Sequence, residues 1–262
     1  MNFRVWWLAW MSAMMGLSAG AALSTTAAAA ERSWTISPAI ASRYLFRGVE
    51  RAGASFQTSF DYTADALSAG VWSNFALDDS GAANTDPEID LYASYALSGQ
   101  SAQFQIVPGF CLYTHPDAKR SHGGYPVTLE PNLATVFFVR GIQFTPKACY
   151  DLMLKGATFE LTAAYALPLT TLGTELDFNA SVGTFKYHAA RADATPAVKN
   201  WGDYWLVGVS LPYQISARGR VLLNVTYSEG RNNYFKPTGS PRSAFCNAAS
   251  GAFVTLSYAV TL

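Results

Sequence analysis

The sequence predicts an all-β fold: a transmembrane, antiparallel, up-and-down β-barrel of about twelve strands that follows a cleaved signal peptide. Three observations predict it. Apolar and polar residues alternate over long segments, the connections between those segments alternate in length, and charged residues make up only 14 % of the chain. A soluble domain carries roughly 25 % charged residues, so this composition indicates a surface that faces something apolar.

Residues 1–30 have the pattern of a secretory signal peptide. Arg4 is their one charged residue, an apolar run follows it, and the alanines at 27–30 supply an A-x-A cleavage pattern before Glu31. An uncleaved membrane anchor is the alternative. No Cys lies near the junction, so lipid attachment is not expected. We expect residues 31–262 to form a single outer-membrane β-barrel domain, inserted into outer-membrane lipid by the barrel-assembly machinery.

The composition excludes several classes of protein. The 18 basic and 18 acidic residues balance, which argues against a nucleic-acid partner because such binding needs a basic surface. The aromatic content of 14 % excludes disorder. Export would place Cys111, Cys149 and Cys246 in an oxidising space, where one pair could bridge and one thiol would be left over. No metal-ligand spacing, nucleotide motif or cofactor motif is present, so no cofactor is expected.

Period-two alternation is the main signal for strands, because successive side chains of a strand point to opposite faces. In residues 101–113, Phe104, Ile106 and Phe110 fall on one face, whereas Gln103 and Gln105 fall on the other. Most such segments are 9 to 14 residues long, which suits tilted strands crossing a bilayer. The predicted strands are residues 34–47, 55–63, 67–77, 87–97, 101–113, 127–138, 141–150, 157–167, 174–187, 201–214, 219–228 and 251–262.

The connections alternate between long polar segments and tight turns, as in an outer-membrane barrel whose long loops face outward. The long ones are residues 78–87, 114–126, 188–200 and 229–250, and the tight ones are residues 63–66, 98–101, 139–140 and 216–218. Two others, 151–156 and 168–173, are intermediate in length. The last strand alternates to the final residue, so we expect it to pair with the first strand and close the barrel.

Aromatic residues gather towards the ends of the predicted strands, which favours interfacial girdles. These residues are Trp34, Tyr44, Phe46, Trp72, Phe75, Tyr113, Tyr150, Tyr165, Tyr187, Tyr213 and Tyr227. The polar face also carries charges and amides at mid-strand, as a wet lumen requires. A secreted soluble β-sandwich remains an alternative, because alternation also occurs in sandwich strands.

Three short motifs resemble the N-terminal signature of the TorF-type porin family. They are the heptapeptide SRYLFRG at 42–48, the tripeptide WSN at 72–74, and Glu88-x-Asp90-x-Tyr92. The resemblance is strongest over residues 34–97 and implies an exported bacterial outer-membrane channel, without identifying a solute. The chain departs from such barrels at its end, since Leu262 stands where an aromatic residue is common.

Charged residues on the polar face are the candidate pore-lining residues. Arg43 and Arg47 lie four apart in the first predicted strand and should therefore share its lumen face. The full candidate set is Arg43, Arg47, Asp61, Glu88, Asp90, Glu130 and Glu160. Two interpretations stay open: a basic wall opposite an acidic wall that screens solutes, or charges that neutralise one another and plug the barrel.

The size of the barrel permits a pore. Twelve strands ~4.8 Å apart and tilted ~40° give a circumference of ~75 Å, a diameter of ~24 Å and ~10 Å of open space inside the side chains. Residues 78–87 or 229–250 are long enough to fold inward and constrict the mouth. Arg231, Lys236 and Arg242 in or beside the second loop could contact anions or sugars, although a solvated surface loop is the simpler account.

The sequence therefore predicts a porin-like channel, not an enzyme, for passive diffusion of small hydrophilic solutes across the outer membrane. The alternatives are a non-conducting structural or adhesive barrel, an outer-membrane lipid-modifying enzyme and the secreted sandwich. The enzyme would need a His beside a nucleophile or base. His115, His122 and His188 all lie in or beside predicted long loops, without a recognisable catalytic context. The oligomeric state is left open.

Overall fold

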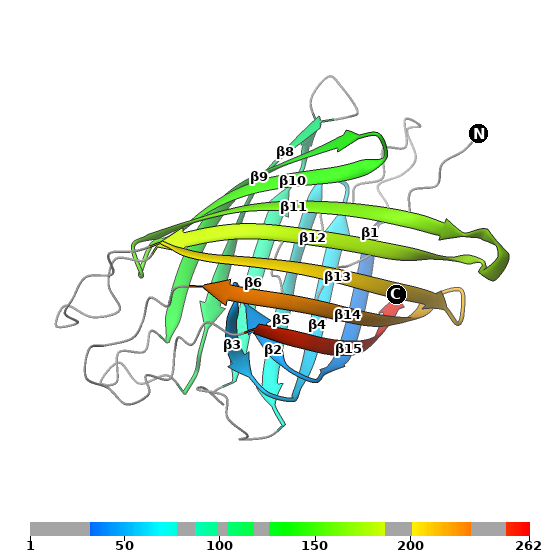
Figure 1. Cartoon of the computed structure of the whole chain (residues 1–262), viewed down its shortest axis with the longest axis horizontal. Coiled ribbons are helices and arrows are strands. Elements are labelled where there is room, and N and C mark those ends of the chain that lie inside the picture. The colour runs from blue at the N-terminus through cyan, green and yellow to red at the C-terminus, as the bar shows by residue number, and fades with distance from the viewer. Residues whose placement is uncertain (1–31, 78–86, 99–103, 118–125, 187–200, 232–249) are drawn as a thin grey trace.

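The computed structural model describes residues 32–77, 87–98, 104–117, 126–186, 201–231 and 250–262. They form a closed antiparallel barrel of twelve strands (Figure 1). Its wall strands are β1 (Arg32–Ala41), β4 (Ser55–Ala64), β5 (Leu67–Ala76), β6 (Glu88–Tyr95), β8 (Phe104–Thr114), β9 (Val127–Val139), β10 (Ile142–Asp151), β11 (Gly156–Leu169), β12 (Thr174–Lys186), β13 (Gly202–Gln214), β14 (Gly219–Arg231) and β15 (Ser250–Thr261). The predicted signal peptide lies outside the described residues.

Each wall strand pairs with its neighbour along the chain, and the ring closes between the first and the last strand. Ile40 of β1 lies opposite Leu256 of β15, and Thr35 lies opposite Thr261. Closure removes the unpaired strand edges that a bilayer, which offers no water as a partner, does not tolerate. The up-and-down barrel predicted from the alternation is therefore confirmed, and the soluble sandwich is not the fold.

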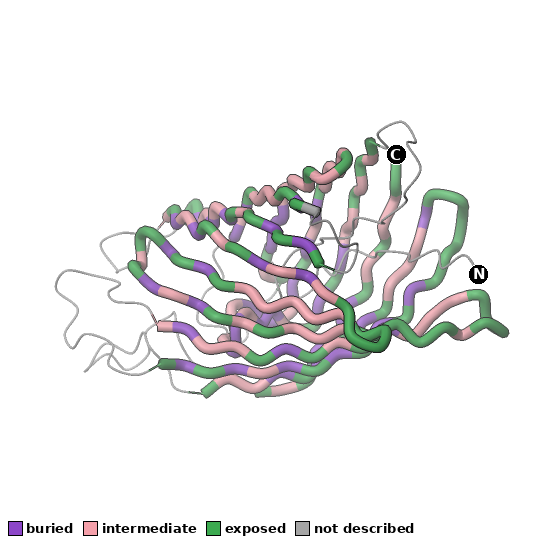
Figure 2. The backbone as a smooth tube through the Cα atoms, turned by 90° about the horizontal axis from the view of Figure 1, so that it is seen from above, coloured by how far each residue is buried: buried purple, intermediate pink, exposed green. Residues whose placement is uncertain are grey.

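The two faces of each strand differ in the way that a membrane barrel requires. Along β8, Phe104, Ile106 and Phe110 are 41 %, 40 % and 44 % exposed, whereas Gln105 and Val107 between them are buried. Buried and exposed residues alternate in the same way along most of the other strands (Figure 2). Because a single-layered ring has only one enclosed side, the buried residues face the interior and the exposed apolar residues form the outer surface. No helix in the described ranges is long and apolar enough to cross a membrane.

The barrel has two unlike ends. The strands meet residues 42–54, 77–87, 115–126, 152–155, 187–201 and 232–249 at one end, here called the long-connection end. The other end, the short-turn end, holds both Arg32 of β1 and Thr261 of β15. The two connections of intermediate length differ in place: residues 152–155 lie at the long-connection end, and the 3-10 helix η2 (Thr170–Leu172) lies at the short-turn end. A short β7 (Leu97–Ser98) extends the sheet beside β8.

The first predicted strand is the one prediction of a strand that fails. Residues 34–47 do not form one strand: β1 ends at Ala41, and the chain then folds into a hairpin of β2 (Tyr44–Phe46) and β3 (Val49–Ala52). This hairpin forms a separate two-stranded sheet. The alternation continues across residues 42–47 because β2 is itself a strand, so the pattern alone did not reveal the break.

The aromatic girdle was predicted too broadly. Trp34, Tyr150 and Tyr213 are exposed on the outer surface, as a girdle requires. Tyr44, by contrast, is buried, and so are the inward side chains Trp72 and Tyr113. Predicted girdle residue Tyr187 lies outside the described residues. Inward aromatics at strand ends therefore have another role, which is packing against the β2–β3 hairpin.

The described cysteines are not joined to each other by a disulfide. Cys111 on β8 lies opposite Glu130, and Cys149 on β10 lies opposite Asn132, so β9 separates the two thiols. Two strand spacings are about 9.6 Å, which exceeds the Cα separation that a disulfide spans. Cys246 lies outside the described residues.

Candidate functional site

The β2–β3 hairpin turns at Arg47 and Gly48. Both residues have a positive φ, 51° and 71°. A two-residue turn with two such residues matches the right-handed twist of the flanking strands, and glycine takes this conformation without steric cost. Arg47 does not, because its Cβ clashes with the backbone there, at a cost of about 1–2 kcal/mol. The contacts of its side chain must offset that cost.

The hairpin lies inside the barrel and packs against the inward aromatics. The ring of Tyr44 packs at a tilt against that of Trp72 of β5, with the centroids 5.3 Å apart, and Phe46 packs in the same way against Tyr113 of β8 at 5.9 Å. Tyr44, Ala52 and Trp72 form a buried apolar cluster. These contacts attach β2 to the wall strands β5 and β8.

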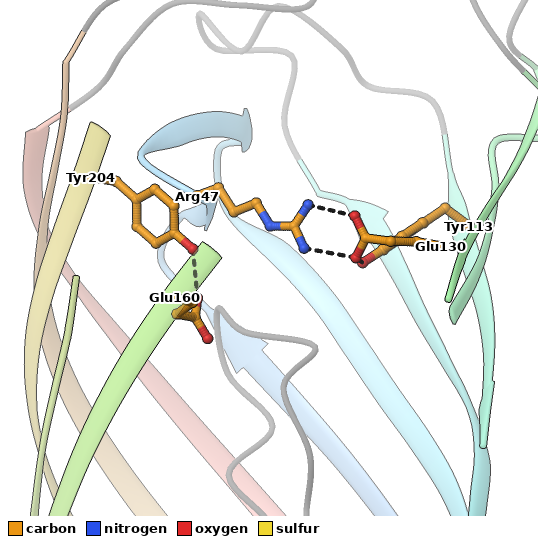
Figure 3. A network of polar contacts seen from close by, with 5 residues as sticks. All are labelled: Arg47, Tyr113, Glu130, Glu160 and Tyr204. Atoms are coloured by element: carbon orange, nitrogen blue, oxygen red, sulfur yellow. Dashed lines mark hydrogen bonds and ion pairs between the residues drawn. The ribbon is translucent and has the colours of Figure 1, made fainter. Parts of the chain in front are cut away.

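Arg47 makes a two-pronged ion pair with Glu130 of β9. Its two terminal nitrogens donate to the two carboxylate oxygens at 2.8 Å and 2.7 Å. The Tyr113 hydroxyl donates to the same carboxylate at 3.1 Å. The Arg47 and Glu130 side chains are 7 % and 2 % exposed. Figure 3 shows Arg47 reaching from the hairpin across the interior to Glu130 on the wall. Short, bidentate hydrogen bonds between an arginine and a carboxylate are among the strongest hydrogen bonds in proteins.

The tip of the hairpin touches a different part of the wall. A Cβ on Gly230 of β14 would lie 2.0 Å from the Gly48 carbonyl oxygen, and a Cβ on Gly48 would lie 2.8 Å from Cβ of Tyr204 on β13. Only two glycines permit an approach this close. Between β14 and β9, four strands lie one way around the ring and six lie the other way. The hairpin therefore spans the interior between nearly opposite walls.

A polar cluster holds the returning strand of the hairpin. The guanidinium of Arg51 on β3 lies 3.3 Å from Nε2 of His115, and Glu88 lies 3.9 Å from the same nitrogen. Because Arg51 has only donors, the His115 ring must accept and is neutral. Burial, and then the charge of Arg51, lowers the pKa of His115 to about 3. His115 lies beside a long connection, as predicted, but it is buried, not on the surface.

A second ion pair lies within the hairpin segment. Arg43 and Glu50 approach to 2.6 Å, with side chains 28 % and 26 % exposed. The hydrogen bond to Glu50 raises the pKa of Arg43, partly offset by burial. The prediction that Arg43 and Arg47 share the lumen face of one strand is wrong, because β1 ends before both residues and Arg47 occupies a left-handed turn.

The remaining candidate residues point into the barrel from the wall. Asp61 of β4 accepts hydrogen bonds from Tyr92 and Ser59. Asp90 accepts from the backbone N–H of Thr114 at 3.2 Å and has no exposed surface. These positions agree with the face that alternation assigned to them.

Glu160 of β11 lies close to the tip of the hairpin. Its Oε2 accepts a hydrogen bond of 2.6 Å from the Tyr204 hydroxyl (Figure 3). A Cβ on Gly183 would lie 2.2 Å from Cζ of Tyr204, so this glycine allows the ring to lie against the wall. Tyr204 therefore contacts both Glu160, through its hydroxyl, and Gly48 at the tip of the hairpin, through its Cβ.

Sequence reasoning missed the segment that folds inward. The two connections judged long enough to do so, 78–87 and 229–250, lie mostly outside the described residues, whereas residues 42–54 cross the interior. One signal was available. Gly48 separates two short strand-like runs, and a glycine in that position is a turn signal. The roles of Tyr113, Tyr204 and Arg51 had no signal of their own, because their partners are distant in the sequence.

Solved outer-membrane porins share this fold. The KdgM porin aligns with a TM-score of 0.52 and 11 % identity, covering 87 % of this chain and 98 % of that one. The NanC porin aligns with the same score and identity, covering 87 % and 100 %. At such identity the likeness establishes the fold alone. A closed twelve-stranded barrel with an apolar outer surface is a protein of the bacterial outer membrane.

Sequence comparison identifies a family. Among curated proteins no sequence matches the chain. The profile of a bacterial family, Gcw_chp, described as "Bacterial protein of unknown function", matches residues 26–227. That match covers most of the barrel, from before β1 to within β14. The chain therefore belongs to the Gcw_chp family of bacterial proteins.

Proposed function

We propose that the protein is a channel for passive diffusion of small hydrophilic solutes across the outer membrane, constricted by the β2–β3 hairpin. The observation that carries this proposal is the polar inner face of the barrel. About half of the buried positions on the described wall strands are Ser, Thr, Asn, Gln, Asp or Glu, including Gln57, Asn74, Ser181, Ser210 and Thr255. A wet lumen needs polar side chains at such positions.

The resemblance of the motifs at 42–48, 72–74 and 88–92 to the TorF-type porin family supports the same function. So does the fold shared with KdgM and NanC. KdgM has been solved in complex with an oligogalacturonate, which makes a sugar one class of solute to test here. The pore-lining role of Arg43, Arg47, Asp61, Glu88, Asp90, Glu130 and Glu160 is part of this proposal.

A non-conducting barrel is the second candidate, and one observation favours it. The hairpin is attached at nearly opposite walls, through Arg47 to Glu130 and through Gly48 to Gly230. A hairpin that contacts both of these walls narrows the interior permanently, unless one of the two contacts breaks. The two candidates differ in a measurable quantity, which is the conductance with and without the hairpin.

The experiment is single-channel recording of the refolded mature chain in a planar bilayer. We expect discrete steps of stable size for the wild type. Replacing residues 44–52 by a short Gly-Ser linker should raise the step size, because it removes the constriction and leaves the wall strands intact. Replacing Leu152 and Met153, which are exposed in the turn at the same barrel end, by Gly and Ser is the matched control and should leave the step size unchanged.

Each alternative outcome has a distinct meaning. Conductance in the linker variant alone would identify the wild type as a closed channel. Silence from both proteins, with barrel formation verified by heat-modifiable gel mobility, would contradict the channel function and support a structural barrel.

A further inference from the structure

The charges inside the barrel are unbalanced. Among the described wall strands, eight acidic side chains face the interior: Asp61, Glu88, Asp90, Glu130, Asp151, Glu160, Glu175 and Asp177. Two basic side chains, Lys147 and Arg220, face the same way. The wall therefore carries a formal excess of six negative charges, although the whole chain is neutral.

The hairpin segment offsets only part of this excess. Residues 42–54 contain three arginines and Glu50, a formal charge of plus two. Each arginine faces an acidic group: Arg43 pairs with Glu50, Arg47 pairs with Glu130, and Arg51 lies beside Glu88 through His115. The positive charges of the hairpin are thus already matched by carboxylates. The described interior keeps a formal excess of four negative charges.

The matched charges lie on one side of the barrel. The hairpin reaches β5 and β8 through Tyr44 and Phe46, and it reaches β6 through Arg51 and His115. Its turn reaches β9 through Arg47 and reaches β13 and β14 through Gly48. Strands β10, β11 and β12 form the arc of the ring between β9 and β13, and none of these hairpin contacts reaches them. Their inward charged residues are Lys147, Asp151, Glu160, Glu175 and Asp177, a formal excess of three negative charges.

Two of these acids lie at different depths. Glu160 lies one tyrosine side chain from the tip of the hairpin. Asp177 lies near the short-turn end, opposite Ser210 of β13, and interacts electrostatically with Glu175 and Arg220. Lys147 lies opposite Glu160 in the β10–β11 register and is the nearest compensating charge on that arc. Lys147 therefore offsets the formal charge of Glu160 at their shared level. The net negative charge of the arc comes from Asp151 near the long-connection end and from Glu175 and Asp177 near the short-turn end.

We propose that solutes pass between the hairpin and the arc of β10, β11 and β12, and that this path selects cationic over anionic solutes, with Glu160 and Asp177 as its specificity-determining residues. The inference rests on the proposed channel function and names its solute class. A fixed excess of one sign in a narrow, water-filled path raises the local concentration of the opposite sign. Neutral solutes would pass without preference.

The test is the reversal potential of the refolded full mature chain in a KCl gradient. The wild type should prefer K⁺ over Cl⁻. The preference should weaken between 0.1 M and 1 M salt, because the screening length falls from ~10 Å to ~3 Å. Glu160→Gln and Asp177→Asn should each move the permeability ratio towards one. Glutamine keeps an oxygen that accepts the Tyr204 hydrogen bond, so we expect the first variant to fold.

Two variants distinguish selectivity from a general structural effect. Lys147→Gln should change the permeability ratio in the opposite direction, towards stronger preference for K⁺. Asp203→Asn removes the same charge as Asp177→Asn, but Asp203 is exposed on the outward face of β13, next to Tyr204. It should leave the permeability ratio unchanged.

The failures are separable. Channels that prefer Cl⁻, or show no preference at 0.1 M salt, would overturn the inference and leave the channel function standing. Equal effects of Asp203→Asn and Asp177→Asn would overturn the assignment of Asp177. Absence of channels from a verified barrel, with and without the hairpin, would overturn the channel function and this inference with it.

Discussion

At the scale of single residues, the pair between Arg47 and Glu130 is the most buried ion pair in the part of the chain that the structure describes. Both side chains are nearly fully buried, and they come from segments 83 positions apart in the chain. A buried pair of this kind adds little net stability relative to an apolar pair of the same volume. Removing one partner is costly, because the other charge then stays buried without compensation. Its role here is to fix where the hairpin lies.

Glu130→Ala should release the hairpin without unfolding the barrel. The buried guanidinium of Arg47 would lose its carboxylate. This loss should destabilise the docked state, in which the hairpin packs against the inside of the wall, by ~3–5 kcal/mol. We expect trypsin to cleave the refolded variant at Arg47 and Arg51, sites that docking protects in the wild type.

Arg43→Ala is the matched control. Its pair with Glu50 is about a quarter exposed, and exposed pairs contribute ~0–1 kcal/mol. The hairpin of this variant should stay as resistant as that of the wild type. Equal resistance of Glu130→Ala and wild type would show that the ion pair does not hold the hairpin.

At the scale of elements, the hairpin is held by contacts that differ in their response to pH. The cluster of Arg51, His115 and Glu88 requires a neutral imidazole. Docking buries the imidazole and places a guanidinium beside it, both of which oppose protonation. Proton binding to His115 and packing of the hairpin against the wall therefore oppose each other.

Acidification should weaken docking. The pKa of His115 is lowered from 6.5 to about 3 in the docked state, so the undocked state binds the proton more readily. Docking is then fully stable above pH 6.5 and loses stability progressively as the pH falls from 6.5 towards 3. We expect trypsin sensitivity of the hairpin, assayed by short pulses after equilibration at each pH, to rise between pH 7 and pH 5.

His115→Gln isolates this effect, because glutamine is polar and does not titrate. The variant should show a flatter pH profile over the same interval. A profile as steep as that of the wild type would assign the pH response to other groups, such as the carboxylates of Glu88 and Asp90.

At the scale of the whole molecule, the two faces of the ring of strands meet different environments, which are lipid outside and water inside. The outer surface is apolar and uninterrupted across the closure between β15 and β1, where Leu256 and Ile40 are 52 % and 59 % exposed. The inner surface is polar and carries the net negative charge described above. The barrel is stable only where these two environments coexist, which is a membrane that contains a wet lumen.

Leu256→Arg should destabilise the barrel in a lipid bilayer. Leu256 lies on the outer face at the middle of β15, and a charge at the midplane of a barrel costs ~2–4 kcal/mol. The measurement is the urea midpoint of the barrel folded into lipid vesicles. Leu262→Arg, at the short-turn end, should cost only ~0–1 kcal/mol because it lies near the interface. Equal shifts for the two variants would contradict the placement of β15 across the bilayer.

The sequence by itself determined the wall. The alternation of apolar and polar residues, as in 104–114, depends only on which face of a strand meets lipid. This pattern placed eleven of the twelve wall strands within a few residues of their observed bounds. The inward faces of Asp61, Glu88, Asp90, Glu130 and Glu160 followed from the same rule. Local period and turn length carry this information because each wall strand contacts mainly its neighbours along the chain.

Only the tertiary structure decided what lies inside the wall. That Arg47 meets Glu130, and that Gly48 meets Gly230, depends on how the closed ring brings β9 and β14 to opposite sides of a hairpin. The alternation of residues 42–47 fits a wall strand and an inward hairpin equally well, since both are strands. Which one forms is decided by long-range partners, a buried carboxylate and a pair of glycines, and these come together only when the barrel closes.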